Sequence, residues 1–334
     1  MNHRVSFRGT GVEYFNIWIV NTLLKAITLS VYSAWAKVRK RRYFAGKIFL
    51  DNESFEYLAD PLALFRGWLI AAAAIVLYTI VSRFSPRLAI VLMFALTALS
   101  PWVVVRSRIF NSRNTAYKNI RFNFAPNYGE AYLVFLGLWG LVPFTLGILI
   151  PYVFYRQKRF LMENTSYGTT PFRFRAEPWE FYKLFLIAFL LLLCSGILIP
   201  VVNAVFTLCF GKKMWWFIPL FVATAYFVLF VYVKTAMTNL VWNRTELGGL
   251  RFSSSMESLT VFWLYLSGGV ATICSLGFLF PWASVRLMRY RCACMMVRSQ
   301  EGIGQFVADT ASASTGAAGE EIGDLFGLDV DFGF

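Results

Sequence analysis

An internal repeat is the feature that most constrains how this chain can fold. Residues 7–61 align with residues 124–178 without a gap, and a third, shorter copy matches the second over residues 275–290. The shared pattern is Thr/Ser-Leu-Gly/Ser-x-x-x-Pro-Trp/Tyr-x-x-x-Arg-x-x-Arg-Tyr/Phe. A period of this length marks one structural unit that is used several times. We therefore expect two and a half copies of one unit and then a tail: repeat I at 1–120, repeat II at 121–250, half repeat III at 251–298 and the tail at 299–334.

Two pairs of long apolar segments indicate that the chain crosses a membrane. They cover residues 62–82 with 87–105, and 180–202 with 214–233. About 20 apolar residues are enough to cross the roughly 30 Å hydrocarbon core of a bilayer. Only 15% of the residues are charged, whereas soluble domains carry about a quarter. The links within each pair are short, so the sequence predicts two transmembrane helical hairpins in a polytopic membrane protein.

A further apolar segment, the motif segment, opens each repeat. The three motif segments cover residues 14–36, 130–155 and 258–284. Each contains small residues or proline near its middle, at which a helix could break and turn back. We therefore expect a helical hairpin that re-enters the membrane or lies at its surface, rather than a single full span.

The distribution of basic residues supports this topology. Lysine and arginine gather in loops 37–47, 106–121, 156–175 and 234–251, and again after residue 285. The positive-inside rule favours a cytoplasmic position for all of them, which requires that each motif segment enter and leave on the same face. Seven full spans with inverted repeats are the alternative, but they would place one of two equally basic, homologous loops outside. The sequence thus predicts four true spans, three re-entrant hairpins and two cytoplasmic termini.

Short strand signals follow the basic helix ends. Gly168 and the pair Gly248-Gly249 stand next to Phe-x-Phe patterns such as Phe122-Asn-Phe124 and Phe172-Arg-Phe174. Alternating aromatic residues beside turn residues favour β-hairpins. The predicted fold class is accordingly an all-α polytopic membrane protein with small β-hairpins on its cytoplasmic surface.

The repeated motif resembles that of the YjgN-like family of bacterial inner-membrane proteins. The opening residues 7–15, Phe-Arg-Gly-Thr-Gly-Val-Glu-Tyr-Phe, and the acidic end of the chain are also similar to this family, so the resemblance covers nearly the whole sequence. Copy one departs from the pattern with Ala34 in place of proline and Ser30 in place of glycine. The family has no known activity. The resemblance therefore implies location in a bacterial inner membrane and a fold, but no substrate and no catalytic residue.

Paired arginines behind an aromatic residue are the first candidate site. They can be interfacial anchors whose cations reach into the headgroup layer, or they can cradle anionic lipid headgroups, because residues three apart share a helix face. Both interpretations stay open. The residues concerned are Trp35, Arg39 and Arg42 in copy one, Tyr152, Arg156 and Arg159 in copy two, and Trp282, Arg286 and Arg289 in copy three.

Polar residues inside the apolar segments are the second candidate site, because such residues are functional candidates by default. They are Asn21, Lys25 and Asn203. No acid lies in the middle of a span, which argues against a proton-coupled transporter with a carboxylate relay. A transporter should gather these three residues around a polar cavity, whereas a scaffold should have a packed apolar core.

Composition narrows the possible partners and chemistry. The formal net charge is +14, but the basic residues stand at the ends of apolar segments, which favours anionic membrane lipids over nucleic acid as partners. The five cysteines form no CxxC motif and no cluster with the one histidine, so we expect neither a metal nor another cofactor. Without a catalytic constellation, an enzyme is not expected. The function that remains is a transporter, channel or lipid-handling protein, with a membrane-organising or protein-interaction scaffold as the alternative.

The tail at residues 299–334 holds seven acids and no lysine or arginine. Its Gly, Ala and Ser content cannot build a core. We expect a largely disordered cytoplasmic tail whose apolar end docks weakly on the basic face of the protein.

Overall fold

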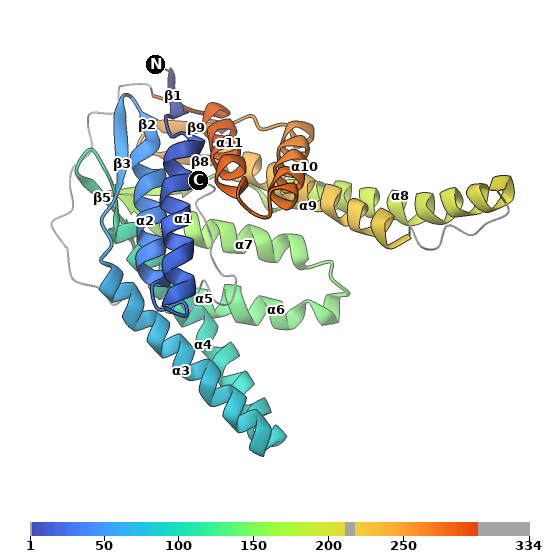
Figure 1. The fold of residues 1–334 in the computed structure, drawn as a ribbon, viewed down its shortest axis with the longest axis horizontal. Helices are drawn as coiled ribbons and strands as arrows, with labels where there is room; N and C mark the ends of the chain where they lie inside the picture. The colour runs from blue at the N-terminus through green and yellow to red at the C-terminus, as the bar shows by residue number, and fades with distance from the viewer. Residues whose placement is uncertain (1, 211–217, 300–334) are drawn as a thin grey trace.

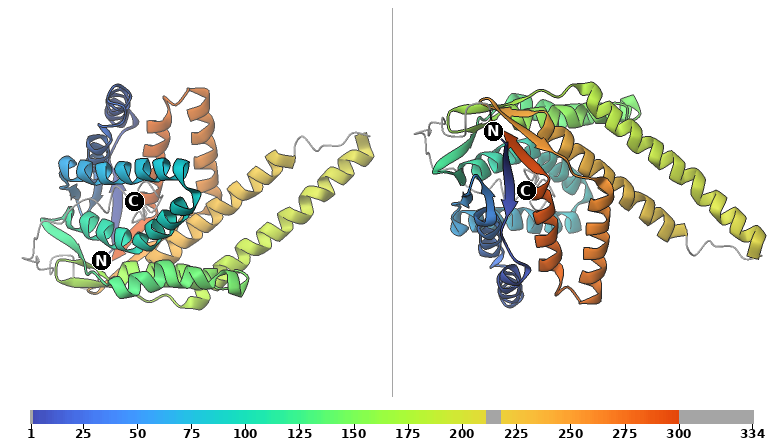
Figure 2. Two further views of the ribbon diagram at one scale, coloured as in Figure 1. Left: turned by 90° about the horizontal axis from the view of Figure 1, so that it is seen from below. Right: turned by 90° about the horizontal axis from the view of Figure 1, so that it is seen from above.

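The fold is built on a closed antiparallel β-barrel of ten short strands, which lies at one end of the molecule, at the upper left in Figure 1; Figure 2 shows it from two further sides. The computed structural model describes residues 2–210 and 218–299. Around the barrel the strand order is β1-β10-β9-β8-β7-β6-β5-β4-β3-β2, and β2 pairs with β1 to close it. The strands are β1 (Asn2–Phe7), β2 (Ile48–Leu50), β3 (Glu53–Tyr57), β4 (Thr115–Tyr117), β5 (Ile120–Phe124), β6 (Thr165–Tyr167), β7 (Thr170–Phe174), β8 (Thr245–Leu247), β9 (Leu250–Ser254) and β10 (Met295–Arg298).

The barrel corrects the predicted fold class. An all-α fold with separate small β-hairpins is wrong, because the hairpins β2–β3, β4–β5, β6–β7 and β8–β9 pair edge to edge with one another and with the terminal strands. The physical reason is that an isolated two-stranded hairpin is at best marginally stable in water. Closure into a barrel gives every strand two partners and leaves no exposed edge.

Side chains alternate between the inside and the outside of the barrel. In β1, Val5 and Phe7 are buried while Arg4 and Ser6 are exposed, and β7 buries its phenylalanines and exposes Arg173. A transmembrane barrel has the opposite pattern, with apolar residues outside and polar ones inside. The barrel of this protein therefore has a polar outer face and an apolar interior.

Five helical hairpins leave the barrel in the described part of the chain. Three stand between successive β-hairpins, and the first and last stand between a β-hairpin and the terminal strands β1 and β10. Each starts at the end of one strand and returns to the start of the next, so all ten helix–strand junctions lie at one end of the barrel and the β-turns lie at the other. The hairpins are α1 (Gly11–Ile27) with α2 (Ser33–Lys47); α3 (Pro61–Phe84) with α4 (Pro86–Arg113); the broken helix α5 (Tyr128–Tyr132), η1 (Leu133–Gly137), α6 (Leu138–Leu141) and η2 (Pro143–Thr145) with α7 (Ile150–Glu163); α8 (Pro178–Phe210) with α9 (Ile218–Asn243); and α10 (Ser258–Cys274) with α11 (Phe280–Ala293).

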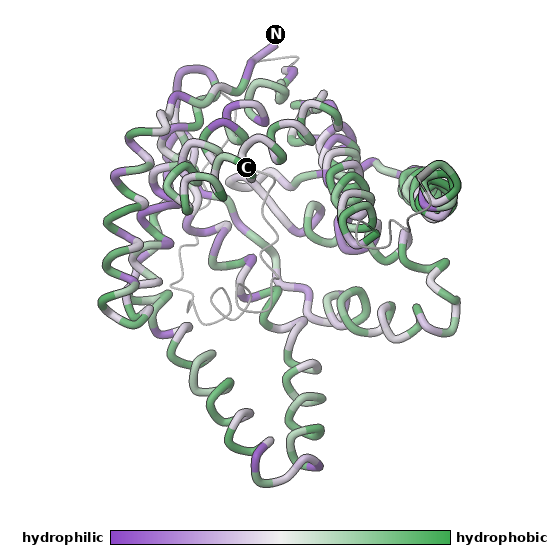
Figure 3. The backbone as a smooth tube through the Cα atoms, turned by 45° about the vertical axis from the view of Figure 1, so that its right-hand side comes forward, coloured by the Kyte–Doolittle hydropathy of each residue, from purple (hydrophilic) through white to green (hydrophobic). Residues whose placement is uncertain are grey.

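The two longest hairpins, α3/α4 and α8/α9, form where the two pairs of spans are predicted. Among the described residues these four helices are long and apolar enough to cross a membrane. They project away from the barrel and are apolar along most of their length (Figure 3). The loops that were expected on one side, around residues 37–60 and 156–178, both contribute strands to the one barrel. They therefore meet in one part of the molecule, and their position on the cytoplasmic face of a membrane stays a prediction.

The three motif segments fold as helix–turn–helix units, as expected from their small residues. The Leu-Gly/Ser step of the motif takes the left-handed conformation in every copy, with φ of 48° and 70° at Leu29 and Ser30, and of 51° and 96° at Leu276 and Gly277. The amide after each leucine donates to the carbonyl five residues earlier, at 2.8 Å from Ser30 to Lys25 and 2.7 Å from Gly277 to Thr272. This bond closes a helix end in the Schellman manner. The motif is thus a helix stop that reverses the chain.

We expect Gly277→Ala to lower the midpoint of thermal unfolding in detergent by the equivalent of about 1 kcal/mol, because a left-handed residue with a Cβ costs roughly 1–2 kcal/mol. A Cβ at Gly277 would meet no neighbouring atom, so backbone strain alone is tested. Gly140→Ala is the matched control, since that glycine is helical and equally unobstructed. A fall of the same size in both variants would contradict this account of the motif.

Apart from Ser299, the acidic tail predicted at 299–334 lies outside the described residues, and so does its expected docking.

Candidate ligand-binding cavity

A cavity of about 490 Å³ lies inside the barrel and extends to the helix ends that feed into it. Its walls come from the inner faces of the strands and from the last turns of α2, α4 and α11. Cavities of roughly 300–1,000 Å³ are the usual size of small-ligand sites.

Each of these three helices turns one face toward the cavity. The lining positions are 37, 40, 41, 44 and 45 in α2, 108, 111 and 112 in α4, and 284, 287, 288 and 291 in α11. This spacing of three, four and seven residues is one helix face. Five of the lining residues on these helix faces are cations, which lie where the helices meet the barrel: Lys37, Lys40, Arg41, Arg108 and Arg291.

The barrel end of the cavity is apolar and rich in aromatic rings. Phe55 stacks on Tyr117 at 4.8 Å between ring centroids, and Phe122 lies 4.9 Å from Tyr167. Phe172 continues the series toward Phe252 at 6.0 Å. Leu50, Leu247, Leu250 and Val297 complete this wall. The cavity therefore changes from basic to apolar along the direction from helices to barrel.

The basic end of the lining consists of cations. Among the described residues that line the cavity, none is acidic. Arg41 donates to the Tyr57 hydroxyl at 3.0 Å and to Asn111 Oδ1 at 2.5 Å. Behind the lining, burial and the nearby charge of Arg108 lower the pKa of Lys158 to about 8. The positive charge of these side chains favours an anion as the ligand of this end of the cavity.

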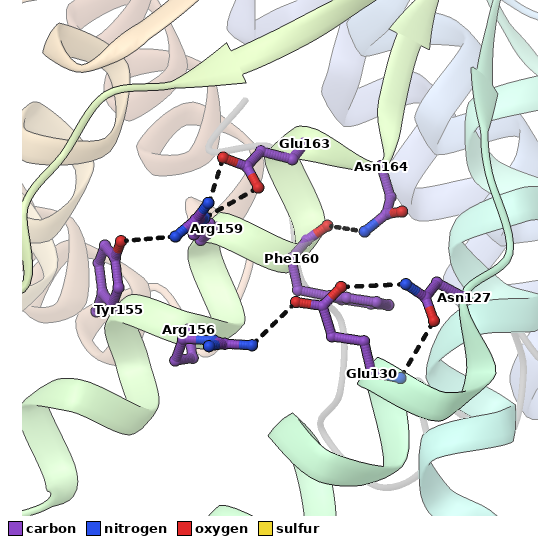
Figure 4. Close-up of polar contacts among 8 residues, drawn as sticks. All are labelled: Asn127, Glu130, Tyr155, Arg156, Arg159, Phe160, Glu163 and Asn164. Atoms are coloured by element: carbon purple, nitrogen blue, oxygen red, sulfur yellow. Dashed lines mark hydrogen bonds and ion pairs between the residues drawn. The ribbon is translucent and has the colours of Figure 1, made fainter.

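Arg156 of copy two joins the two helices at the root of its helical hairpin, whereas Arg159 binds within α7 (Figure 4). Arg156 reaches Glu130 at 3.1 Å, and Asn127 caps α5 by accepting a hydrogen bond from the Glu130 amide. Arg159 pairs with Glu163 at 3.0 Å and donates to the Tyr155 hydroxyl at 3.3 Å, while Tyr152 packs 6.0 Å from the Tyr155 ring. Other hairpin roots have a similar contact, such as Lys47 with Glu13 at 3.2 Å.

The arginines of copies one and three mostly bind the protein's own backbone. Arg42 donates to the carbonyl of Ala59 at 2.8 Å and Arg289 to that of Gly9 at 3.0 Å. Arg286 lies 5.3 Å over the Trp282 ring and donates to the Ser267 hydroxyl.

Of the remaining residues of this candidate site, Arg39 is exposed and Trp35 is stacked between Tyr32 and Phe65. The structure does not gather these nine residues into one site, and their contact with lipid headgroups stays a prediction.

The second candidate site is likewise dispersed. Asn21 is buried on α1 and donates to the Ala36 carbonyl at 3.4 Å. Lys25 is exposed one turn further along α1, and Asn203 lies on the distal part of α8, far from α1 (Figure 1). None of the three lines the cavity in the barrel.

In the sequence, the five cavity cations were interpreted only as parts of the basic loops, and their position in one cavity was not predicted. The signal that could have found them is their spacing. In residues 37–50, Lys37, Lys40 and Arg41 share a helix face with Phe44, and the face leads directly into the inward-pointing residues of β2. In this segment, cations on one helix face are followed by an aromatic residue and then by a strand, and this order is the sequence signal for the residues that line the cavity.

Comparison with known proteins places the chain among bacterial membrane proteins. The model of a family described as "bacterial protein of unknown function (DUF898)" matches residues 2–325. The chain is 35% identical over 124 residues to the inner membrane protein YjgN of Salmonella typhimurium, and 30% identical over 125 residues to that of Escherichia coli K12. Each alignment covers 37% of this chain but only 31% of the relative. No solved structure matches.

Proposed function

Since this chain belongs to the DUF898 family of bacterial proteins of unknown function, we propose its function from the cavity: it binds an anionic membrane lipid there. The headgroup lies among the cations at the helix ends, and one acyl chain enters the barrel. The observation that carries this proposal is the order of the lining, in which five cations are followed by an apolar, aromatic wall.

The position of the cavity relative to the membrane supports this arrangement. The cations stand on the same end of the barrel as the helical hairpins, and the spans of α3/α4 and α8/α9 start from that end. The basic end therefore faces the bilayer surface, where lipid phosphates lie. A lipid can keep its headgroup at that level while one chain turns into the barrel and the other stays in the bilayer. Burial of each methylene contributes about 0.8 kcal/mol.

Lipid retention tests the proposal. The purified full chain in detergent is given equal amounts of phosphatidylglycerol and phosphatidylcholine with identical acyl chains, and bound lipid is measured by native mass spectrometry. Wild type is expected to retain phosphatidylglycerol preferentially. The double variant Lys40→Gln/Arg291→Gln should reduce that preference about 30-fold, because each charge near an anionic headgroup contributes about 1 kcal/mol.

Arg121→Gln/Arg173→Gln is the matched control, since it removes two cations that are exposed on the outside of the barrel and do not line the cavity. It should keep the wild-type preference. An equal loss in both double variants would mean that lipid is held by overall charge and not by the cavity. Equal retention of the two lipids by wild type would refute lipid recognition and leave the scaffold hypothesis.

A further inference from the structure

Two tyrosines lie across the turn end of the cavity. The residue directly before each two-residue β-turn points inward and lines the cavity, and these residues are Leu50, Tyr117, Tyr167 and Leu247. They are the lining residues of β2, β4, β6 and β8 that stand furthest from the helix ends. Whatever enters from the basic end meets them last.

Hydrogen bonds fix the direction of both tyrosine rings. The Tyr117 hydroxyl donates to the carbonyl of Leu50 at 2.7 Å, and the Tyr167 hydroxyl donates to that of Tyr117 at 2.8 Å. Each bond joins a strand to the second strand along, across β3 or β5. Because neighbouring strands lie about 4.8 Å apart, each side chain bridges roughly 10 Å of the barrel wall. The rings thus cover the end of the barrel rather than stand along its axis.

Packing makes this cover rigid. Tyr117 and Tyr167 lie 6.3 Å apart between centroids, and each also contacts a phenylalanine, Phe55 and Phe122 respectively. Burial raises the pKa of Tyr167 to about 12, so its hydroxyl stays a donor at physiological pH. Each ring is held by contacts with neighbouring rings and by its hydroxyl bond, so it cannot change its rotamer without the loss of a buried hydrogen bond.

We propose that Tyr117 and Tyr167 form a floor that limits how long an acyl chain the barrel accepts. This inference rests on the proposed function, because it takes the occupant to be a lipid chain that enters from the basic end. The floor determines specificity for chain length, while the cations determine specificity for the headgroup.

The experiment varies chain length at a constant headgroup. Wild type and variants receive an equal mixture of dimyristoyl, dipalmitoyl and distearoyl phosphatidylglycerol, and the bound species are counted by native mass spectrometry. Tyr167→Ala should move the preference toward longer chains by about fourfold per added methylene, which corresponds to about 0.8 kcal/mol. Tyr167→Phe keeps the ring and its contact with Phe122 but removes the hydroxyl bond, so it should move the preference in the same direction by a smaller amount.

Leu247→Trp is a second, independent variant that adds bulk to the floor instead of removing it. It should move the preference toward dimyristoyl lipid, and it remains informative if Tyr167→Ala fails to fold. Variants that retain phosphatidylglycerol with an unchanged chain-length profile would refute the floor and leave the proposed function intact. Wild type without any preference for phosphatidylglycerol over phosphatidylcholine would overturn both.

Discussion

Val5→Lys is expected to destabilise the protein by about 3–5 kcal/mol, the usual cost of an uncompensated buried charge. Val5 is 6% exposed and points into the barrel from β1, the strand that joins β2 to β10 and so closes the ring. Its neighbours inside are apolar, and the cavity cations would repel a further positive charge. The denaturant midpoint of the purified protein in detergent measures the effect.

Ser6→Lys provides the comparison, because Ser6 is the next residue of the same strand and is exposed on the outer face. It should change the free energy of unfolding by no more than about 0.5 kcal/mol. If residues 2–7 were a loose end beside an all-α protein, both substitutions would be harmless. Equal tolerance of the two would therefore contradict barrel closure.

Phe160→Ala is expected to cost about 3–5 kcal/mol as well, by the loss of a fully buried aromatic side chain. Phe160 is 1% exposed, and its ring contacts Phe124 at 5.9 Å and Phe135 at 5.8 Å. The cluster that contains it joins α4, α5, α7 and β5. Loss of this ring would loosen the junction between the second β-hairpin and two helical hairpins.

Phe144→Ala is the control for Phe160→Ala, since Phe144 stands at the tip of the same helical hairpin and is 84% exposed. Thermal unfolding followed by tryptophan fluorescence should separate the two variants clearly. A similar midpoint for both would mean that the cluster around Phe160 contributes little to stability.

Local signals in the sequence were enough to predict the helices and their reversals. The spans of α3/α4 and α8/α9 follow from apolar length, and the turn at Leu276-Gly277 follows from a residue pair that stops a helix. Both features depend on residues that are close in sequence. The resemblance to the YjgN-like family, which rested on the same motif, is confirmed by the family match.

The barrel could not be predicted in this way, because its pairings join distant segments. β3 pairs with β4 across the whole α3/α4 hairpin, and β1 pairs with β10 from the other end of the chain. Each β-hairpin taken alone has the sequence of a surface hairpin, and the segment Phe172-Arg-Phe174 was interpreted in this way. The barrel interior exists only when all the hairpins pair with one another, and no single segment indicates these pairings.

The repeat also extends further than two and a half copies. Residues 101–117 match residues 151–167 at one constant offset, from Pro101 and Pro151 through Arg106 and Arg156 to Tyr117 and Tyr167. The end of a plain span, α4, therefore resembles the returning helix of a motif segment, α7. In the structure both deliver a strand to the barrel in the same manner. Among the described residues, the architectural unit is one helical hairpin followed by two neighbouring strands of the barrel. It occurs five times: four units end in a β-hairpin, and after α10/α11 the two strands are β10 and its partner β1.

The pairing of β1 with β10 has a consequence for how the chain is made. The N-terminal strand leaves the ribosome first, and its partner on one side follows almost three hundred residues later. During that interval the five described helical hairpins are made, two of them long and apolar enough to cross a membrane, while one edge of β1 stays without its native partner. An uncovered strand edge invites pairing with another chain. A chain that ended before Met295 would thus keep that edge of β1 and one edge of β9 unpaired, so closure of the barrel depends on the synthesis of β10.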